Sequence, residues 1–104
     1  MSDWVRACAV DDIEPEDVIR FDHGGRTFAV YRSPDNEFYA TDGNCTHEET
    51  HLAEGFVIDE VIVCPKHNGR FDYRTGRALG APVLDDLDVY PVRIEDGSVY
   101  VDIG

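Results

Sequence analysis

The chain has little positive charge and lacks any long apolar run. Nine Lys and Arg residues stand against 22 Asp and Glu residues in a chain of 104, which gives a formal net charge of -13. Because the phosphates of nucleic acids and anionic membranes would repel such a surface, we expect neither as a partner. No stretch approaches the roughly 18 apolar residues that span a bilayer. These absences favour a globular protein that works away from membranes.

Signals of secretion are also missing. The start of the chain holds no apolar segment of signal-peptide length and already carries Asp3, Asp11 and Asp12. The chain has 3 cysteines, an odd number that argues against a disulfide framework. We therefore expect a soluble cytoplasmic protein in which cysteine either binds metal or is buried.

No window of the sequence repeats apolar residues at helical period. Short runs of β-branched and aromatic residues recur between turn signals instead, so the sequence predicts an all-β chain. We expect strands over residues 4–10, 18–22, 26–32, 37–41, 56–59, 60–64, 70–74, 88–95 and 98–103. His23-Gly24-Gly25 and Asp96-Gly97 are typical hairpin turns. Pro91 indicates an edge strand, because proline cannot donate to a sheet ladder.

Residues 43–82 differ in composition from the segments on either side. They hold two of the three Cys and three of the four His. They also hold four of the nine basic residues, namely Lys66, Arg70, Arg74 and Arg77. We expect one domain over residues 1–104, an antiparallel β base into which a small β subdomain of about residues 43–82 is inserted.

Two pairs of metal-ligand residues stand out in that subdomain. Cys45 and His47 form a C-x-H motif, and Cys64 and His67 form a C-x-x-H motif. Zinc accepts two Cys and two His, so a zinc-stabilised interaction module is one reading. Zinc motifs usually begin with C-x-x-C, whereas each motif here supplies one thiolate and one imidazole. In an extended segment the Cα atoms of residues i and i+2 lie about 6.5 Å apart with their side chains on one face, so a thiolate and a longer imidazole can reach two neighbouring metals.

With these two motifs the chain resembles the Rieske iron-sulfur proteins. The resemblance covers nearly the whole sequence and includes three further features, namely Arg70-Phe71-Asp72, the Thr75-Gly76 turn and the Ala81-Pro82 segment, which in the family covers the cluster as a third loop. It implies the Rieske fold and one [2Fe-2S] cluster. It further implies that Cys45 and Cys64 bind one iron and that His47 and His67 bind the other.

The sequence departs from the high-potential respiratory members of that family at four positions. Those members carry an extra cysteine in each ligand loop, joined as a disulfide, and a serine and a tyrosine that donate to the cluster. Here Thr50, Lys66, Gly69 and Phe71 occupy these places. Since hydrogen bonds to the sulfurs raise the potential, we expect a value low in the Rieske range of roughly -150 to +300 mV.

The resemblance implies a bacterial Rieske-type ferredoxin, an electron-transfer component and not itself an enzyme. The large oxygenase subunits of the family continue into a mononuclear-iron catalytic domain, for which this chain has no residues. No G-x-G-x-x-G motif is present to bind NADH. We expect a monomer that carries electrons from a flavin-containing, NAD(P)H-dependent ferredoxin reductase to the terminal oxygenase of a ring-hydroxylating dioxygenase system in aromatic hydrocarbon catabolism. The alternative is a Rieske-like small subunit fixed in a larger oxidoreductase.

The remaining Cys and His residues are expected to have structural roles. His51 follows His47 closely, but with His47 at the family's ligand position it should be a surface residue or one that supports the ligands. His23 should be an exposed turn residue, and Cys8 a small buried hydrophobe.

Charged residues near the two motifs suggest electrostatic steering. Glu48 and Glu49 are either solvated loop charges or part of a docking surface. Lys66 and the arginines at 70, 74 and 77 would supply positive charge beside the cluster. We hypothesise that the ligand-loop end of the molecule docks to both redox partners.

Overall fold

The computed structural model describes residues 2–46, 50–65, 68–80 and 85–104. Within these residues the strands form antiparallel sheets. The first sheet contains β1 (Trp4–Ala9), β11 (Ser98–Asp102) and β10 (Val92–Glu95), in that order. The second contains β2 (Asp17–His23), β3 (Arg26–Arg32), β4 (Phe38–Asp42) and β9 (Val89–Tyr90). The third contains β5 (Phe56–Ile58), β6 (Val61–Val63), β7 (Arg70–Asp72) and β8 (Arg77–Ala78).

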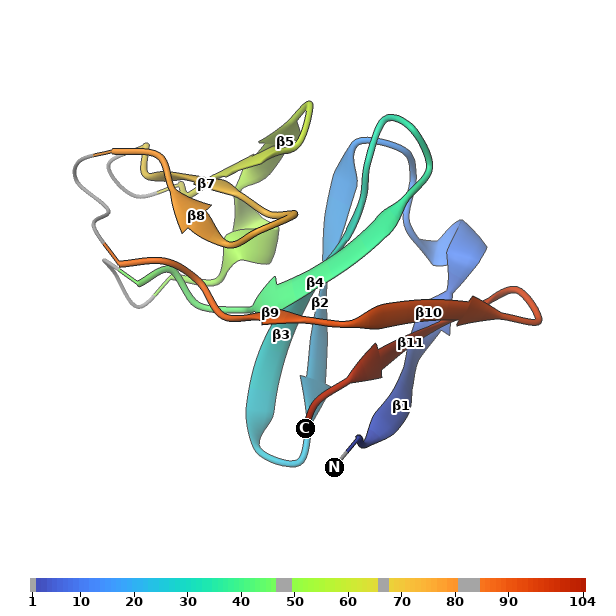
Figure 1. Cartoon of the computed structure of the whole chain (residues 1–104). Coiled ribbons are helices and arrows are strands. Elements are labelled where there is room, and N and C mark those ends of the chain that lie inside the picture. Colours follow the sequence, from blue (N-terminus) through green and yellow to red (C-terminus); the bar gives the residue numbers. More distant parts are fainter. Residues whose placement is uncertain (1, 47–49, 66–67, 81–84) are drawn as a thin grey trace.

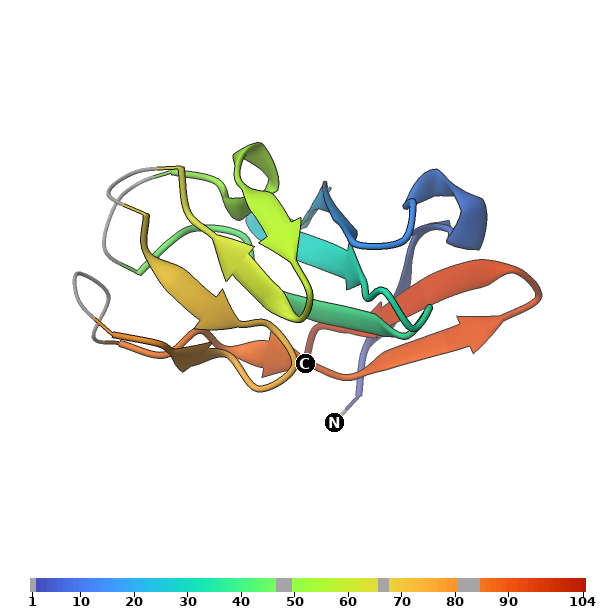
Figure 2. The same ribbon diagram turned by 90° about the horizontal axis from the view of Figure 1, so that it is seen from above.

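These sheets are arranged along the length of the molecule. The sheet of β5 to β8 lies at one end, the sheet of β1, β10 and β11 lies at the other, and the sheet of β2, β3, β4 and β9 lies between them (Figures 1 and 2). All the strands of the end sheet β5 to β8 come from the chain between β4 and β9. The all-β prediction is confirmed, and the described residues add only two 3-10 turns, η1 (Val10–Asp12) and η2 (Leu52–Glu54).

The predicted hairpins are present with the expected turn chemistry. Gly24 and Gly25 join β2 to β3 with φ of 58° and 78°, and Asp96 and Gly97 join β10 to β11 with φ of 51° and 77°. Two consecutive positive φ angles are typical of the type I′ turn, whose twist matches that of paired strands. The predicted strand over residues 26–32 has the same bounds as β3, while several others are a residue or two shorter or longer.

One predicted strand, residues 88–95, is wrong in its continuity. The chain forms β9 before Pro91 and β10 after it, and these two strands belong to different sheets. Pro91 lacks the N–H that would continue a ladder, so the chain passes from one sheet to the other at this residue. Both β9 and β10 are edge strands, which confirms the edge position that Pro91 predicted. The two-residue strand β8 was not predicted, because two residues are too few for a periodic signal.

Two hydrophobic cores meet on β3, a strand that is buried on both faces. Alternate side chains point to opposite faces, so Val30 packs into the core of the terminal sheet with Val99 and Val101. Ala29 and Tyr31 pack into the second core, under the end sheet of β5 to β8. In that core the Tyr31 and Tyr73 rings stack with centroids 4.5 Å apart and planes 4° apart. The second core therefore fixes the end sheet to the base.

Among the described residues, no helix has the length and apolar character that a membrane crossing needs.

Candidate metal centre

The first predicted ligand loop leaves the base through a short antiparallel stalk, residues 43–45 and 50–52. Its rungs are the hydrogen bond from Leu52 N–H to the Gly43 carbonyl (2.7 Å), the Asn44–His51 bridge, and the hydrogen bond from Cys45 N–H to the Thr50 carbonyl (3.0 Å). Gly43 N–H in turn donates to the Thr27 carbonyl of β3 at 3.0 Å. Cys45 thus stands where the stalk ends and the loop begins.

The second predicted ligand loop joins β6 to β7 and is closed in the same way. Cys64 N–H donates to the Gly69 carbonyl at 2.7 Å. In both loops the cysteine N–H therefore bonds the carbonyl of the residue five positions later, 45 to 50 and 64 to 69. The same hydrogen bond therefore closes both loops, although the two motifs differ in spacing.

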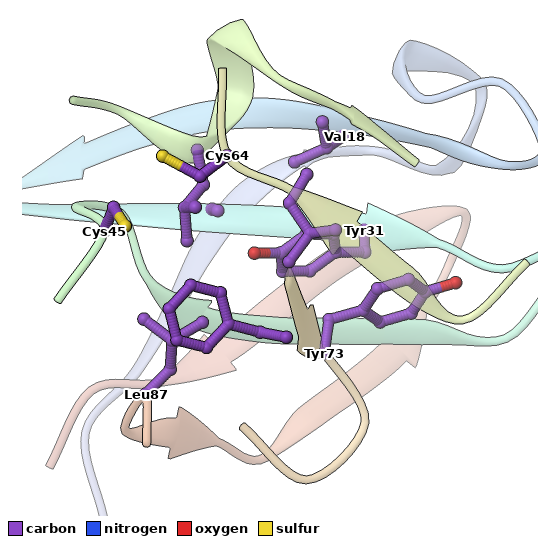
Figure 3. Packing of buried hydrophobic residues seen from close by; sticks show 10 residues of the cluster. Val18, Tyr31, Cys45, Cys64, Tyr73 and Leu87 are labelled. Carbon is purple, nitrogen blue, oxygen red and sulfur yellow. The ribbon is translucent and has the colours of Figure 1, made fainter. Parts of the chain in front are cut away.

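Both cysteines at these bases are buried in the same core. Cys45 is 6% exposed and Cys64 is fully buried, and both belong to the core cluster with Leu52, Phe71 and Leu87. Figure 3 shows their sulfur atoms at the same end of this cluster, away from Tyr73. All the cysteines lie in the described part of the chain, and none is in a disulfide. Two loops from different sheets therefore bring two thiols to one region.

The predicted imidazole ligands, His47 and His67, lie outside the described residues, as do Lys66, Glu48 and Glu49. Within the described residues no three His, Cys, Asp or Glu side chains are grouped so as to hold a metal ion. The predicted ligand set of Cys45, His47, Cys64 and His67 thus remains a prediction. The Ala81-Pro82 segment also lies outside the described residues. Shortly after it, the backbone carbonyl of Asp85 accepts a 2.8 Å hydrogen bond from Thr46 Oγ1.

His51 is buried, so the alternative that placed it on the surface is wrong. It is 5% exposed, and burial is the main cause that lowers the pKa of its imidazole. Nδ1 accepts the Ala53 N–H at 3.0 Å, and Nε2 lies 2.8 Å from Thr27 Oγ1. Because both ring nitrogens are engaged, this imidazole offers no lone pair to a metal.

The two other residues predicted to be structural are confirmed in their placement. His23 is exposed in the β2–β3 hairpin. Cys8 is 5% exposed in β1, and burial raises the pKa of its thiol to about 11. At neutral pH Cys8 is therefore a protonated, apolar side chain, whereas a metal ligand must be a thiolate.

The basic residues of the end sheet are not equivalent, which corrects the expectation that Arg74 supplies positive charge. Its guanidinium bonds Asp72 at 3.0 Å and lies 3.9 Å from Glu60, so its charge is compensated. Arg70 and Arg77 are exposed, and within the described residues neither guanidinium has an acidic partner. The register places them on the outward face of the sheet, opposite the face of Phe71.

Sequence reasoning missed Thr27 as the partner of His51 beneath the first loop. Thr27 lies in β3 and His51 in the stalk, 24 residues apart, and Thr27 Oγ1 also donates to Asp22 Oδ1 at 2.5 Å. No local pattern joins residues so distant in sequence. The one available signal was Gly43, which precedes the C-x-H motif and which the prediction treated only as a turn.

Comparison with known proteins identifies the family of this chain. The Rieske [2Fe-2S] domain family matches residues 3–91. The ferredoxin component of the naphthalene 1,2-dioxygenase system of Pseudomonas putida is 41% identical over 100 residues, which cover 96% of this chain and 95% of that protein. This similarity extends over nearly the whole of both sequences.

Solved structures give the same result. The Sphingomonas yanoikuyae B1 ferredoxin superposes with a TM-score of 0.91 at 34% identity, covering 98% of this chain and all (100%) of that one. A chain in the complex of reduced oxygenase and oxidized ferredoxin in carbazole 1,9a-dioxygenase superposes with a TM-score of 0.89 at 39% identity, covering 95% of this chain and 92% of that one. This chain belongs to the Rieske [2Fe-2S] family, with ferredoxins as its full-length relatives, and its cofactor is one Rieske-type [2Fe-2S] cluster.

Proposed function

We propose that this chain is a soluble electron carrier of a ring-hydroxylating dioxygenase system, working between an NAD(P)H-dependent flavoprotein ferredoxin reductase and a terminal oxygenase. It is an electron-transfer component and not an enzyme. The observation that carries this proposal is the similarity to a dioxygenase ferredoxin component over nearly the whole chain. In addition, two loops of the chain each begin at a buried cysteine whose N–H bonds the carbonyl five positions later. Aromatic compounds are the substrate class of the downstream oxygenase.

Four residues would hold the cofactor. Cys45 and Cys64 would bind one iron, and His47 and His67 the other. The described residues fit this assignment, because two loops from different sheets present one buried thiol each at the same end of a core. The bound cluster supplies a one-electron couple, whose potential exceeds that of an all-cysteine cluster because imidazole donates less charge than thiolate. We assign residues 1–104 to one Rieske domain, with about 43–82 as the cluster-binding subdomain.

The chain itself shields and orients the ligand loops. Leu52, Phe71 and Leu87 are buried around the two thiols and keep water from the inner side of the site. The backbone N–H of each cysteine is used within its own loop, to Thr50 or to Gly69, which fixes where the thiol stands. The positions of the two thiols are therefore set by the folded chain itself.

We expect the reduction potential to lie in the lower part of the Rieske range of roughly -150 to +300 mV. Position 71 carries a fully buried phenylalanine, which has no hydroxyl to donate, and Gly69 has no side chain to do so. Protein-film voltammetry measures this directly. A potential near the upper limit would show that other donors replace the missing ones.

The outward face of the end sheet is a suitable docking surface for a redox partner. The cross-strand rows place Arg70 and Arg77 on the same face as Phe56 and Ile58, which are 55% and 52% exposed. The same face carries Asp72, which lies across from Arg77 but is bonded by Arg74. Exposed apolar area beside net positive charge, on a molecule of net charge -13, fits a protein partner that presents carboxylates around an apolar contact.

Reversing the charge of this face should slow electron exchange. For the Arg70→Glu/Arg77→Glu variant we expect the rate of reduction by a ferredoxin reductase to fall about tenfold at low ionic strength, with the difference shrinking as salt is added. Arg6→Glu/Arg93→Glu is the control with the same change in net charge, because Arg6 lies on β1 and Arg93 on β10, both in the sheet at the other end of the molecule. Stopped-flow absorbance gives the rates. Equal slowing by the control would mean that net charge, and not this face, governs the encounter.

We assign the protein to the cytoplasm. Its cysteines are not in disulfides, and a cluster held by thiolates requires that they stay reduced.

The carrier role is tested by anaerobic reduction. NADH alone should leave the visible absorption unchanged, and NADH with a catalytic amount of the naphthalene-system reductase, or dithionite, should bleach it with one electron per chain. Gel filtration of a native extract should show the chain apart from larger subunits. Reduction by NADH alone, uptake of more than one electron, or stable co-elution with a large oxidoreductase would overturn the proposal.

A further inference from the structure

His51 is part of a directional hydrogen-bond chain that leads from the first ligand loop to the surface of the base. Since Nδ1 accepts the Ala53 N–H, the proton of the neutral imidazole is on Nε2. Nε2–H therefore donates to Thr27 Oγ1 at 2.8 Å, which leaves the threonine hydroxyl to donate to Asp22 Oδ1 at 2.5 Å. Every member of the chain has one defined role as donor or acceptor.

The space for this contact exists only because position 43 is glycine. A Cβ at Gly43 would lie 2.5 Å from His51 Nε2 and 3.0 Å from backbone atoms of Thr27 and Phe28. The imidazole therefore passes directly over Gly43 to reach β3. The backbone bond from Gly43 N–H to the Thr27 carbonyl runs beside it, so the stalk is fastened to β3 through both main chain and side chain.

This fastening decides where Cys45 stands relative to Cys64. Cys45 is on the stalk, which rests on β3 of the base, whereas Cys64 follows β6 of the end sheet. The two thiols thus depend on separate sheets for their positions. A stalk that shifts on β3 would move Cys45 without moving Cys64.

We propose that His51 is a positioning residue, which through Thr27 and Asp22 locks the first ligand loop onto β3 and so sets the geometry of the cluster site. The inference rests on the proposed function, because it takes Cys45 and Cys64 as cluster ligands. His51 touches no iron and acts only through the stalk. Loosening the stalk should admit water to the site, and water stabilises the more negative, reduced state, so the potential should rise.

The test uses variants of the two ends of the Nε2 contact. His51→Asn keeps a side-chain oxygen for the Ala53 N–H but is too short to reach β3, and Thr27→Val keeps the shape of threonine without its hydroxyl. Thr27→Ser restores the hydroxyl. Ser33→Ala is the control, because Ser33 is 2% exposed and its Oγ accepts a 3.1 Å bond from Glu37 N–H in the β3–β4 turn, away from both ligand loops.

We expect His51→Asn and Thr27→Val to keep the Rieske visible spectrum, to raise the reduction potential, and to speed cluster loss to a chelator about fivefold, the factor that one hydrogen bond of ordinary strength contributes. The double variant should be no worse than the more affected single variant, since both remove one link. Thr27→Ser should behave as wild type, and Ser33→Ala should lower the unfolding midpoint while leaving the potential unchanged.

Unchanged potential and chelation rate in both single variants, or additive effects in the double variant, would overturn the inference alone. A shift in potential for Ser33→Ala as large as for Thr27→Val would overturn it as well, because general destabilisation would then be the cause. A wild-type protein that takes up no iron and sulfide would overturn both the proposed function and this inference.

Discussion

Cys64→Ser should abolish assembly of the cluster, reducing bound iron from two per chain to background. The Cys64 side chain is fully buried at the base of the second loop, in a core shared with Cys45. A serine there offers a hydroxyl, which is far less acidic than a thiol and does not replace a thiolate on iron. Cys45→Ser should have the same result. Iron and acid-labile sulfide analysis, with the visible spectrum, measures the loss.

Cys8→Ser is the matched control for these variants. Cys8 is as buried as Cys45, at 5% against 6% exposed, but it lies in the core of the terminal sheet. Its substitution should lower the free energy of unfolding by about 1–3 kcal/mol, because a hydroxyl replaces a buried apolar group, and should leave the cluster intact. Loss of the cluster in Cys8→Ser, or its retention in Cys64→Ser, would refute the assignment of the thiol ligands.

Gly76→Ala should be among the most destabilising single substitutions in the chain. Gly76 has a φ of 81°, and a Cβ there would lie 2.1 Å from the Leu87 carbonyl oxygen. Gly76 also accepts the Leu87 N–H at 2.7 Å, so the two segments cannot separate without losing this bond. Left-handed strain and overpacking each cost about 1–3 kcal/mol, so we expect a loss of about 3 kcal/mol or more in the free energy of unfolding.

The effect should reach the cluster, since Leu87 packs in the same core as Cys45 and Cys64. Gly97→Ala separates strain from crowding, because Gly97 has a similar φ of 77° with nothing within 4 Å of the added Cβ. It should cost only about 1–2 kcal/mol and leave the cluster in place. Urea denaturation followed by circular dichroism and by cluster absorbance gives both numbers. Equal losses for the two variants would show that the contact with Leu87 is not the cause.

The parts of the fold that sequence predicted are those with local signals. Paired turn residues such as Asp96-Gly97 identified hairpins, and the turn residues on either side of 26–32 gave the bounds of β3 to the residue. Pro91 correctly predicted an edge strand. The change of sheet at Pro91 was not predictable, because strand-forming residues continue without a break on both sides of it. Which sheets meet is decided by packing between residues distant in sequence.

The same limit applies to the candidate site. The two motifs were readable because ligand spacing is local, and Cys8 was set aside correctly from its apolar neighbours. His51 was placed too near the surface, because its burial depends on Thr27 across the sheet and on the space above Gly43. Arg74 was misjudged although its shorter ion pair is local, since Asp72 stands two residues before it; only Glu60 comes from a neighbouring turn.

The proposed cluster site is tested most directly by identifying the iron ligands of the reduced protein. Iron and sulfide should be present at two each per chain, and electron-nuclear double resonance on protein labelled with ¹⁵N-histidine should show nitrogen coupled to the reduced cluster. That coupling should change in His47→Cys and His67→Cys and persist in His23→Ala and His51→Asn. Zinc in place of iron and sulfide, the absence of nitrogen coupling, or its loss in His51→Asn would contradict a Rieske cluster held by Cys45, His47, Cys64 and His67.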